Sequence, residues 1–193
     1  MPSLIIGLVG QAGCGKGTIA KYFKTHYGAT TFSFSTSMRD VLRRLHLEES
    51  RDHLVKVSEV LRQGFGEDLF SRVIAADARE ATTDLVVIEG IRRPMDIATL
   101  SHLPNFVLVA VEVDIKIRFA RIKARGQNAG ETDMPWEQFL AEEQRSTEIS
   151  IPGVMKEAKH ILKNNGTVDD LAKEAEQLLH ALNYADPHHA HTS

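Results

Sequence analysis

The sequence predicts a single α/β domain built on a doubly wound, five-stranded parallel sheet. Short apolar runs of strand length alternate with helical patterns along the whole chain, and crossover helices between strands favour parallel pairing. The 193 residues suffice for one domain with a sizeable core. We assign this domain to residues 1–185 and expect the histidine-containing segment 186–193 to be a flexible tail.

Five runs are expected to be strands, with helices between them. Leu4–Val9 and Leu85–Ile88 are apolar throughout, as expected of strands buried on both faces. The other strands are expected at 29–35, 106–113 and 160–163. The helices are expected at 16–27, 37–47, 51–63, 67–81, 94–102, 115–125, 135–148 and 167–182. Pro135 suits a first helical turn, and Thr167 is a suitable N-cap.

A glycine-rich segment follows the first strand directly. Residues 10–18 read Gly-Gln-Ala-Gly-Cys-Gly-Lys-Gly-Thr, with the Gly-x4-Gly-Lys spacing of a phosphate-binding loop. Backbone N–H groups of such a loop turn around a phosphate chain, Lys16 adds a positive charge, and the next helix presents its N-terminus. The segment therefore predicts a nucleoside triphosphate site formed by Gly10, Ala12, Gly13, Cys14, Gly15, Lys16, Gly17 and Thr18.

A dinucleotide-binding loop is the nearest alternative motif, and the sequence argues against it. Gly13-x-Gly15-x-x would need Gly or Ala at position 18, where Thr18 stands. The acidic residue that closes the second strand of such folds is also absent near Ser35.

The composition indicates which cellular compartment and which classes of partner are expected. Cys14 is the only cysteine, so a disulfide or four-cysteine zinc site cannot form within the chain, and a reducing cytoplasm is expected. The thiol is either a stabilised thiolate near a helix N-terminus or a small space-filling group. No long apolar segment suggests a membrane partner, and the net charge of −3 disfavours a nucleic-acid surface.

The Gly-Lys-Gly-Thr ending of the loop resembles adenylate kinase and the related nucleoside monophosphate kinases. The resemblance implies ATP as phosphate donor and Thr18 near the α-phosphate, with Mg²⁺ held mainly by water, phosphate oxygens and a distant carboxylate. We place Thr18 and Glu89 at this magnesium site. Ala12 departs from the family, which has proline at that position.

The first acceptor motif is Ser37-x-x-Asp40-x-Leu42-Arg43, which is similar to the family's Ser-Thr-Gly-Asp-x-Leu-Arg. The match implies that Arg43 binds the acceptor phosphate, with Ser37 and Arg39 nearby, on helices within about 36–82. Met38 and Arg39 depart from the family's Thr and Gly. A solvated helix face is the alternative interpretation of Arg43.

The second acceptor motif, Glu89-Gly90-Ile91-Arg92-Arg93-Pro94, follows the third strand. Ligands of such folds bind at strand C-termini. The segment resembles the family's Asp-Gly-Phe-Pro-Arg, with Glu89 in place of the acid and Arg93 in place of the arginine. Arg92 matches better in phage deoxynucleotide monophosphate kinases, phosphomevalonate kinases and uncharacterised archaeal kinase-like proteins. Either arginine therefore remains possible as the acceptor ligand.

A third set of basic residues precedes a polar loop, in a stretch from 115 to 125 that contains no acid: Arg118, Arg121, Lys123 and Arg125. Arg121 and Arg125 lie four residues apart on one helical face, and their spacing resembles the family's Arg-x-x-x-Arg before the lid. The resemblance implies contact with the transferring phosphoryl group and a short lid at about 126–134. Arg145 could close from the other side, although its spacing from Asp133 does not match the family. A basic face, for example for RNA, is the alternative interpretation.

Two further segments complete the expected site. Arg62, Gln63 and Phe65 lie where the family covers the acceptor base, although an ordinary helix break around a core phenylalanine is equally consistent. Asn165 and Gly166 resemble the family's adenine-side loop, where the backbone makes the contacts.

Together these motifs favour an ATP-dependent small-molecule kinase with Lys16, Arg93, Arg121 and Arg125 as catalytic residues. The expected acceptor is a nucleoside monophosphate. Dephospho-CoA kinase, which phosphorylates a ribose hydroxyl, and a nucleotide-dependent regulatory ATPase remain alternatives. Small nucleotides are the expected partners, and both a monomer and a homodimer remain possible.

Overall fold

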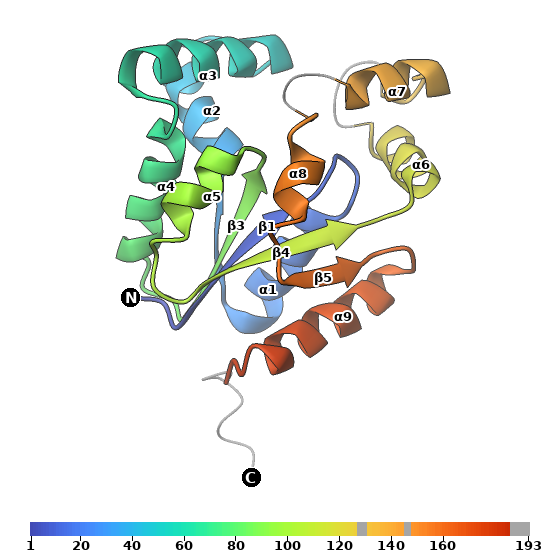
Figure 1. Ribbon diagram of the computed structural model, residues 1–193. Coiled ribbons are helices and arrows are strands. Elements are labelled where there is room, and N and C mark those ends of the chain that lie inside the picture. Colours follow the sequence, from blue (N-terminus) through green and yellow to red (C-terminus); the bar gives the residue numbers. More distant parts are fainter. Residues whose placement is uncertain (127–130, 145–147, 186–193) are drawn as a thin grey trace.

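The computed structural model describes residues 1–126, 131–144 and 148–185 and shows a parallel sheet with helices on both faces (Figure 1). The strands are β1 (Leu4–Val9), β2 (Thr30–Ser33), β3 (Leu85–Ile91), β4 (Phe106–Glu112) and β5 (His160–Lys163). All strand pairs are parallel, and the order is β2-β3-β1-β4-β5. The predicted doubly wound, five-stranded α/β fold is therefore confirmed.

The described helices include all the predicted ones, in the predicted order, and one further short helix, α8. They are α1 (Lys16–Tyr27), α2 (Phe34–Arg44), α3 (Arg51–Phe65), α4 (Leu69–Glu80), α5 (Pro94–Leu100), α6 (Ile115–Arg125), α7 (Trp136–Glu143), α8 (Ile151–Met155) and α9 (Val168–Ala181). None of the helices in the described part of the chain is long and apolar enough to cross a bilayer.

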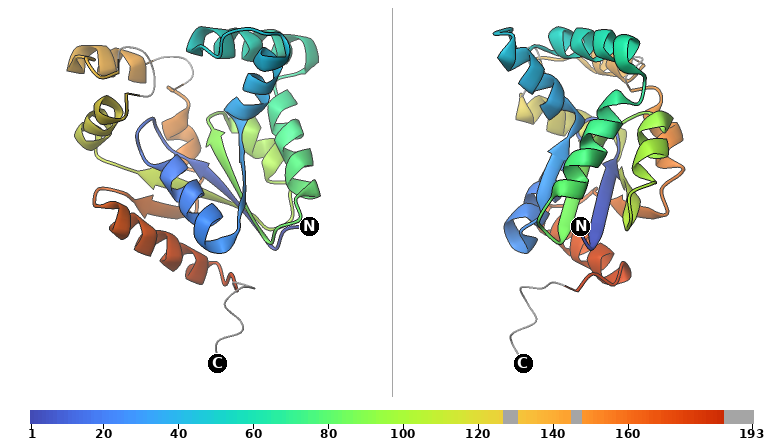
Figure 2. Two further views of the ribbon diagram at one scale, coloured as in Figure 1. Left: turned by 180° about the vertical axis from the view of Figure 1, so that it is seen from behind. Right: turned by 90° about the vertical axis from the view of Figure 1, so that its left-hand side faces the viewer.

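Alternating residues of β1 place their side chains on opposite faces of the sheet. Leu4, Ile6 and Leu8 belong to a core cluster with α1 and α9. Ile5 and Val9 belong to a second cluster with α4, α5 and α8 on the other face. The two further views in Figure 2 show these helices on either side of the sheet. Because both faces are covered, β1 and residues 85–88 of β3 carry no polar side chain, as the sequence suggested.

Several predicted boundaries are wrong. The expected helix at 135–148 ends at Glu143, and a separate helix, α8, begins at Ile151. Because the helix is divided, Phe139 packs against α6, whereas Ile151 joins the core cluster that α4 and α5 form on one face of the sheet. A single straight helix could not serve both clusters. The expected strand at 29–35 ends at Ser33, because Phe34 turns into the core as the first residue of α2.

The break expected at 64–66 is shorter in the structure and is confined to its last residue. Helix α3 continues through Gly64 to Phe65, and the chain turns at Gly66, where φ is +104°. The Phe65 ring is 65% exposed, so the alternative of a core phenylalanine is wrong.

Two helical units stand over the carboxyl edge of the sheet. Helices α2 and α3 rise on one side and α6 and α7 on the other, as Figure 1 shows. The α6–α7 unit has a small core of its own, in which Ile122, Met134 and Phe139 are buried and Ala12 packs against them. The loop after β1 therefore lies between the sheet and this unit.

Candidate phosphate-binding site

The loop between β1 and α1 has the backbone shape that its sequence predicts. Gly15 adopts a left-handed conformation, with φ +99°, and a Cβ atom at this position would lie 2.3 Å from Asn164 Nδ2. A Cβ at Gly10 would lie 2.6 Å from Cys14 Sγ and 2.7 Å from Val111 O. Glycine is therefore required at both positions, by strain and close packing at Gly15 and by close packing at Gly10.

Lys16 curls back over this loop. Its Nζ donates to Gly10 O at 2.6 Å and to Gln11 O at 3.1 Å, and it lies 3.4 Å from Cys14 Sγ. The ammonium group is thus held at the loop by neutral carbonyls, which phosphate oxygens can replace with a gain in charge attraction. Gly17 and Thr18 follow in the first turn of α1 and are exposed, so a ligand can reach them.

Cys14 is fully buried in the core cluster with α1 and α9. This burial favours the interpretation of Cys14 as a space-filling residue, because a reactive thiolate needs an accessible site.

Glu89 lies beside the same loop. It stands in register with Leu8 of β1 and Ser33 of β2, and its Oε2 is 3.7 Å from the position of a Cβ built on Gly17. Burial raises the pKa of the Glu89 carboxyl, and the positive charge of Lys16 partly offsets this effect. Within the described residues no hydrogen bond holds this carboxylate. It is therefore available to a cation at the loop.

We expect Glu89→Gln to raise the free energy of unfolding at neutral pH. The folded protein binds the Glu89 proton more tightly than the unfolded chain, so the charged form costs stability once the pH exceeds the unfolded pKa of about 4.3. Urea unfolding of variant and parent from about pH 4 to about pH 8 measures the difference, which should grow with pH. A difference that shrinks as the pH rises would contradict the burial cost.

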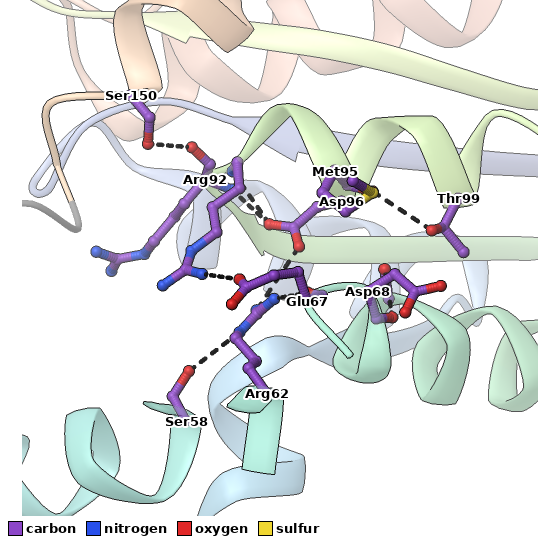
Figure 3. A network of polar contacts seen from close by, with 11 residues as sticks. Ser58, Arg62, Glu67, Asp68, Arg92, Met95, Asp96, Thr99 and Ser150 are labelled. Atoms are coloured by element: carbon purple, nitrogen blue, oxygen red, sulfur yellow. Dashed lines mark hydrogen bonds and ion pairs between the residues drawn. The ribbon is translucent and has the colours of Figure 1, made fainter. Parts of the chain in front are cut away.

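The arginines after β3 belong to a polar network around Asp96 (Figure 3). Asp96 is 1% exposed, and its Oδ2 accepts the backbone N–H groups of Arg92 at 3.2 Å and Arg93 at 3.1 Å. Burial raises the pKa of Asp96, while these N–H groups and the nearby positive charge of Arg62 oppose the rise. Asp96 was not predicted from the sequence, because its role depends on helix α5 starting at Pro94.

Arg62 extends this network to helix α3. Its side chain is 6% exposed, and Nη2 lies 3.7 Å from Asp96 Oδ1, a distance that makes an ion pair without a hydrogen bond. The guanidinium also donates to Ser58 Oγ and Glu67 O and lies over the Phe70 ring. Arg62 therefore ties the end of α3 to the segment after β3.

The guanidinium groups of Arg92 and Arg93 diverge. Arg92 pairs with Glu148, which is 4% exposed, and Arg92 O accepts a hydrogen bond from Ser150 Oγ at 2.7 Å. Arg93 Nη1 donates to Glu67 Oε2 at 2.8 Å. Both arginines are thus paired with carboxylates from other elements.

The first predicted acceptor motif lies apart from this network. Arg43 is exposed, and its guanidinium pairs with Glu49 Oε1 at 2.6 Å and Asp40 Oδ1 at 3.0 Å. Arg39 Nε lies 3.8 Å from Glu49 Oε2. Ser37 is half-buried, and Gln63 is exposed near the end of α3. Arg43 thus pairs with carboxylates of its own segment, whereas Arg92 and Arg93 pair with Glu148 and Glu67.

The two predicted lid arginines have different partners. Arg121 donates to Asn164 O at 2.9 Å and Gly166 O at 3.0 Å, in the turn after β5. Arg125 Nη2 donates to Glu131 Oε1 at 3.2 Å. The Asn165 side chain is used elsewhere, because its Oδ1 accepts a hydrogen bond from the Asp114 N–H at 2.8 Å. Arg145 and residues 127–130 of the predicted lid lie outside the described residues.

A buried ion pair that the sequence did not reveal joins α6 and α7 to the loop. Arg118, which is 2% exposed, donates to Glu143 at 2.6 Å and 3.0 Å and to Ala12 O at 3.1 Å. Gln11 Nε2 donates to Glu143 Oε2 at 2.7 Å. Arg118 belongs to a basic stretch, but only the fold shows that it points inward.

The sheet order, the loop after β1 and the helix that follows define a P-loop NTPase with a kinase-like fold. The chain belongs to the family described as "AAA domain", whose model matches residues 9–139.

The chain is also similar in sequence to curated relatives and in fold to solved structures. A UPF0200 protein from Thermococcus kodakarensis is 28% identical over 181 residues, which cover 91% of this chain and 96% of the relative. One from Pyrococcus horikoshii is 25% identical, with the same coverage of both chains. Shikimate kinase from Bacteroides thetaiotaomicron has a TM-score of 0.63 at 15% identity and covers 93% of this chain and 98% of its own. TT1252 from Thermus thermophilus has a TM-score of 0.60 at 18% identity, covering 94% and 99%. These structural likenesses concern the fold.

Proposed function

We propose that this protein transfers the terminal phosphoryl group of ATP to a small phosphorylated acceptor, with a nucleoside monophosphate as the expected substrate. One observation carries the proposal. Val9 of β1 pairs with Ile91 of β3, so the phosphate loop and the arginine pair leave two neighbouring strands side by side. Phosphoryl transfer requires donor and acceptor phosphates to meet with positive charge around them, which this arrangement supplies.

Lys16 and the loop N–H groups would hold the donor phosphates in this scheme. Glu89, and Thr18 in the first turn of α1, offer a carboxylate and a hydroxyl, which are ligand types that Mg²⁺ accepts. No group of three acidic, histidine or cysteine side chains in the described part of the chain could hold a metal by itself. That fits a Mg²⁺ ion that takes most of its ligands from phosphate and water. Bound there, Mg²⁺ would neutralise charge on the phosphates.

The arginines that follow β3 are paired with carboxylates, which an anionic ligand could replace. Arg92 and Arg93 are held by Glu148 and Glu67. A phosphate dianion carries more negative charge than a carboxylate and can bind a guanidinium through two oxygens, so an acceptor phosphate can compete with both carboxylates. A phosphate acceptor is already ionised near neutral pH and needs no general base. Arg121 and Arg125 on α6 are the expected ligands of the transferring group. Arg121 is bound to the turn after β5, which also contacts the loop through Asn164.

A hydroxyl acceptor, such as the ribose of dephospho-CoA, is the second candidate. The half-buried Glu89 favours it, because a carboxylate with a raised pKa beside the phosphate loop could accept a hydroxyl proton.

A coupled assay of ADP release with Mg-ATP and each common nucleoside or deoxynucleoside monophosphate tests the proposal. Parallel reactions contain dephospho-CoA or no acceptor. We expect ADP release that depends on one or a few monophosphates. Turnover with dephospho-CoA alone would support the second candidate. ATP hydrolysis that no acceptor accelerates would instead indicate a regulatory ATPase.

Alanine variants of Arg92, Arg93 and Arg43 should separate acceptor from donor binding. We expect the variant that loses the acceptor ligand to raise the acceptor KM by about tenfold or more, since a charged hydrogen bond contributes roughly 1.5–3 kcal/mol. ATP affinity without acceptor should remain near that of the parent. Steady-state kinetics and ATP titration provide the two measurements.

Arg79→Ala is the matched control, because Arg79 is exposed in the last turn of α4, toward the other edge of the sheet. An equal loss of ATP affinity in all three arginine variants would show that the acceptor assignment is wrong.

A further inference from the structure

We propose that Asn164 is a positioning residue for the donor nucleotide, which holds the phosphate loop and Arg121 in one arrangement. The inference rests on the proposed binding of ATP at the loop. It concerns a residue that the sequence motifs did not indicate, since only the neighbouring Asn165 resembled a family position.

Both ends of the Asn164 amide group are used. Asn164 is 4% exposed, and its Nδ2 donates to Cys14 O in the phosphate loop at 2.9 Å. Its Oδ1 accepts from Arg121 Nη2 at 3.3 Å, and its backbone O accepts from Arg121 Nη1 at 2.9 Å. The side chain therefore links two groups that the proposed mechanism assigns to the donor.

The contact with Cys14 O determines how the loop presents a donor group. A trans peptide places its C=O and N–H on opposite sides. When Asn164 binds the Cys14 carbonyl, it also sets the direction of the Gly15 N–H, which belongs to the N–H groups that a phosphate loop offers to its ligand. Without the Asn164 donor this peptide unit is free to rotate, and the loop loses part of its preorganisation.

The absence of a side chain at Gly15 makes room for the Asn164 amide group. A Cβ at Gly15 would stand 2.3 Å from Asn164 Nδ2. The glycine of the loop thus gives the amide group the space to approach the backbone, and close contact between the two segments depends on both residues.

The turn that carries Asn164 is itself held in place. The Asn164 N–H donates to Glu112 O at 2.9 Å, and Asp114 N–H binds Asn165 Oδ1. Thr167 and Asp170 form a capping box at the start of α9. Because the turn is fixed from both sides, Asn164 can act as a rigid support for Arg121 and the loop.

Titration calorimetry of the full chain with Mg-ATP tests this inference without reference to the acceptor. We expect Asn164→Ala to weaken ATP binding by about tenfold, which corresponds to a loss of about 1.4 kcal/mol of binding free energy. A loss of this size is expected when the hydrogen bonds of one side chain are removed. Asn164→Asp keeps the shape but replaces the donor with an acceptor that faces Cys14 O, so it should bind ATP at least as weakly as the alanine variant. This variant serves as the test if Asn164→Ala does not fold.

Two comparisons distinguish positioning from simple packing. The double variant Asn164→Ala/Arg121→Ala should lose less affinity than the product of the single losses, because the two side chains act through one contact. Thr83→Val removes hydrogen bonds between the amino ends of β2 and β3, away from the loop. It should lower the melting temperature and leave ATP affinity unchanged.

The possible results separate this inference from the proposed function. Parent-like ATP affinity in folded Asn164 variants would overturn the positioning role and leave the kinase proposal standing. Fully multiplicative losses in the double variant would also overturn it. A parent protein that does not bind ATP would overturn both proposals.

Discussion

Lys16→Ala should reduce kcat by a factor on the order of a hundred to a thousand, as expected when one preorganised group that stabilises transition-state charge is removed. In the structure the Lys16 ammonium lies on Gly10 O and Gln11 O, at the mouth of the phosphate loop. Its charge is expected to act most strongly on the transferring group, so ATP affinity should fall less than kcat. Steady-state kinetics with saturating Mg-ATP and the acceptor found in the screen measure the loss.

Lys24→Ala is the matched control for this experiment. Lys24 is exposed in the last turn of the same helix, α1, so its removal changes the net charge equally. The control should retain parent activity. If Lys16→Ala were as active as this control, the loop would not take part in the reaction.

Arg118→Met should destabilise the fold by about 3–5 kcal/mol, the cost of leaving a buried carboxylate without its partner. Arg118 and Glu143 are both largely buried, with side chains 3% and 9% exposed. The variant leaves Glu143 its hydrogen bond from the Gln11 amide but no charged partner from α6. For a domain of this size the melting temperature should fall by roughly 10 °C. Thermal and urea unfolding measure both quantities.

The double variant Arg118→Met/Glu143→Leu provides the decisive comparison. Replacing both charges with apolar side chains removes the unpaired carboxylate, and the Phe139 ring already lies against the Arg118 side chain. We therefore expect most of the lost stability to return. A double variant that is as unstable as Arg118→Met would mean that packing, not charge pairing, dominates at this position.

The fold was largely predictable because its signals are local. The apolar runs of β1 and β3, the Gly-x4-Gly-Lys spacing and the Thr167 N-cap depend on neighbours within a few residues, and the structure confirms the strands, the loop and the N-cap. Helix ends were less predictable where they depend on packing against residues that are remote in the sequence. The expected 135–148 helix divides because Phe139 and Ile151 belong to different core clusters.

The partners of the charged side chains could not be predicted, because they come from distant parts of the chain. Arg92 pairs with Glu148, 56 residues later, and Asn164 binds Cys14 O across 150 residues. The sequence marked Arg92 and Arg93 as anion ligands through their position after a strand. It did not indicate Asp96, which orients the backbone of both.

The sequence by itself therefore determined the α/β class, the alternation of strands and helices in a parallel sheet, and the phosphate loop. These follow from short-range periodicity and spacing. Only the tertiary structure decided which arginines face the loop, which are held by carboxylates, and that Asn164 and Arg118 support the loop from either side. The physical reason is that a side chain's charge and hydrogen-bonding capacity are local properties. The low-dielectric site in which they act is created by packing segments that are remote in sequence.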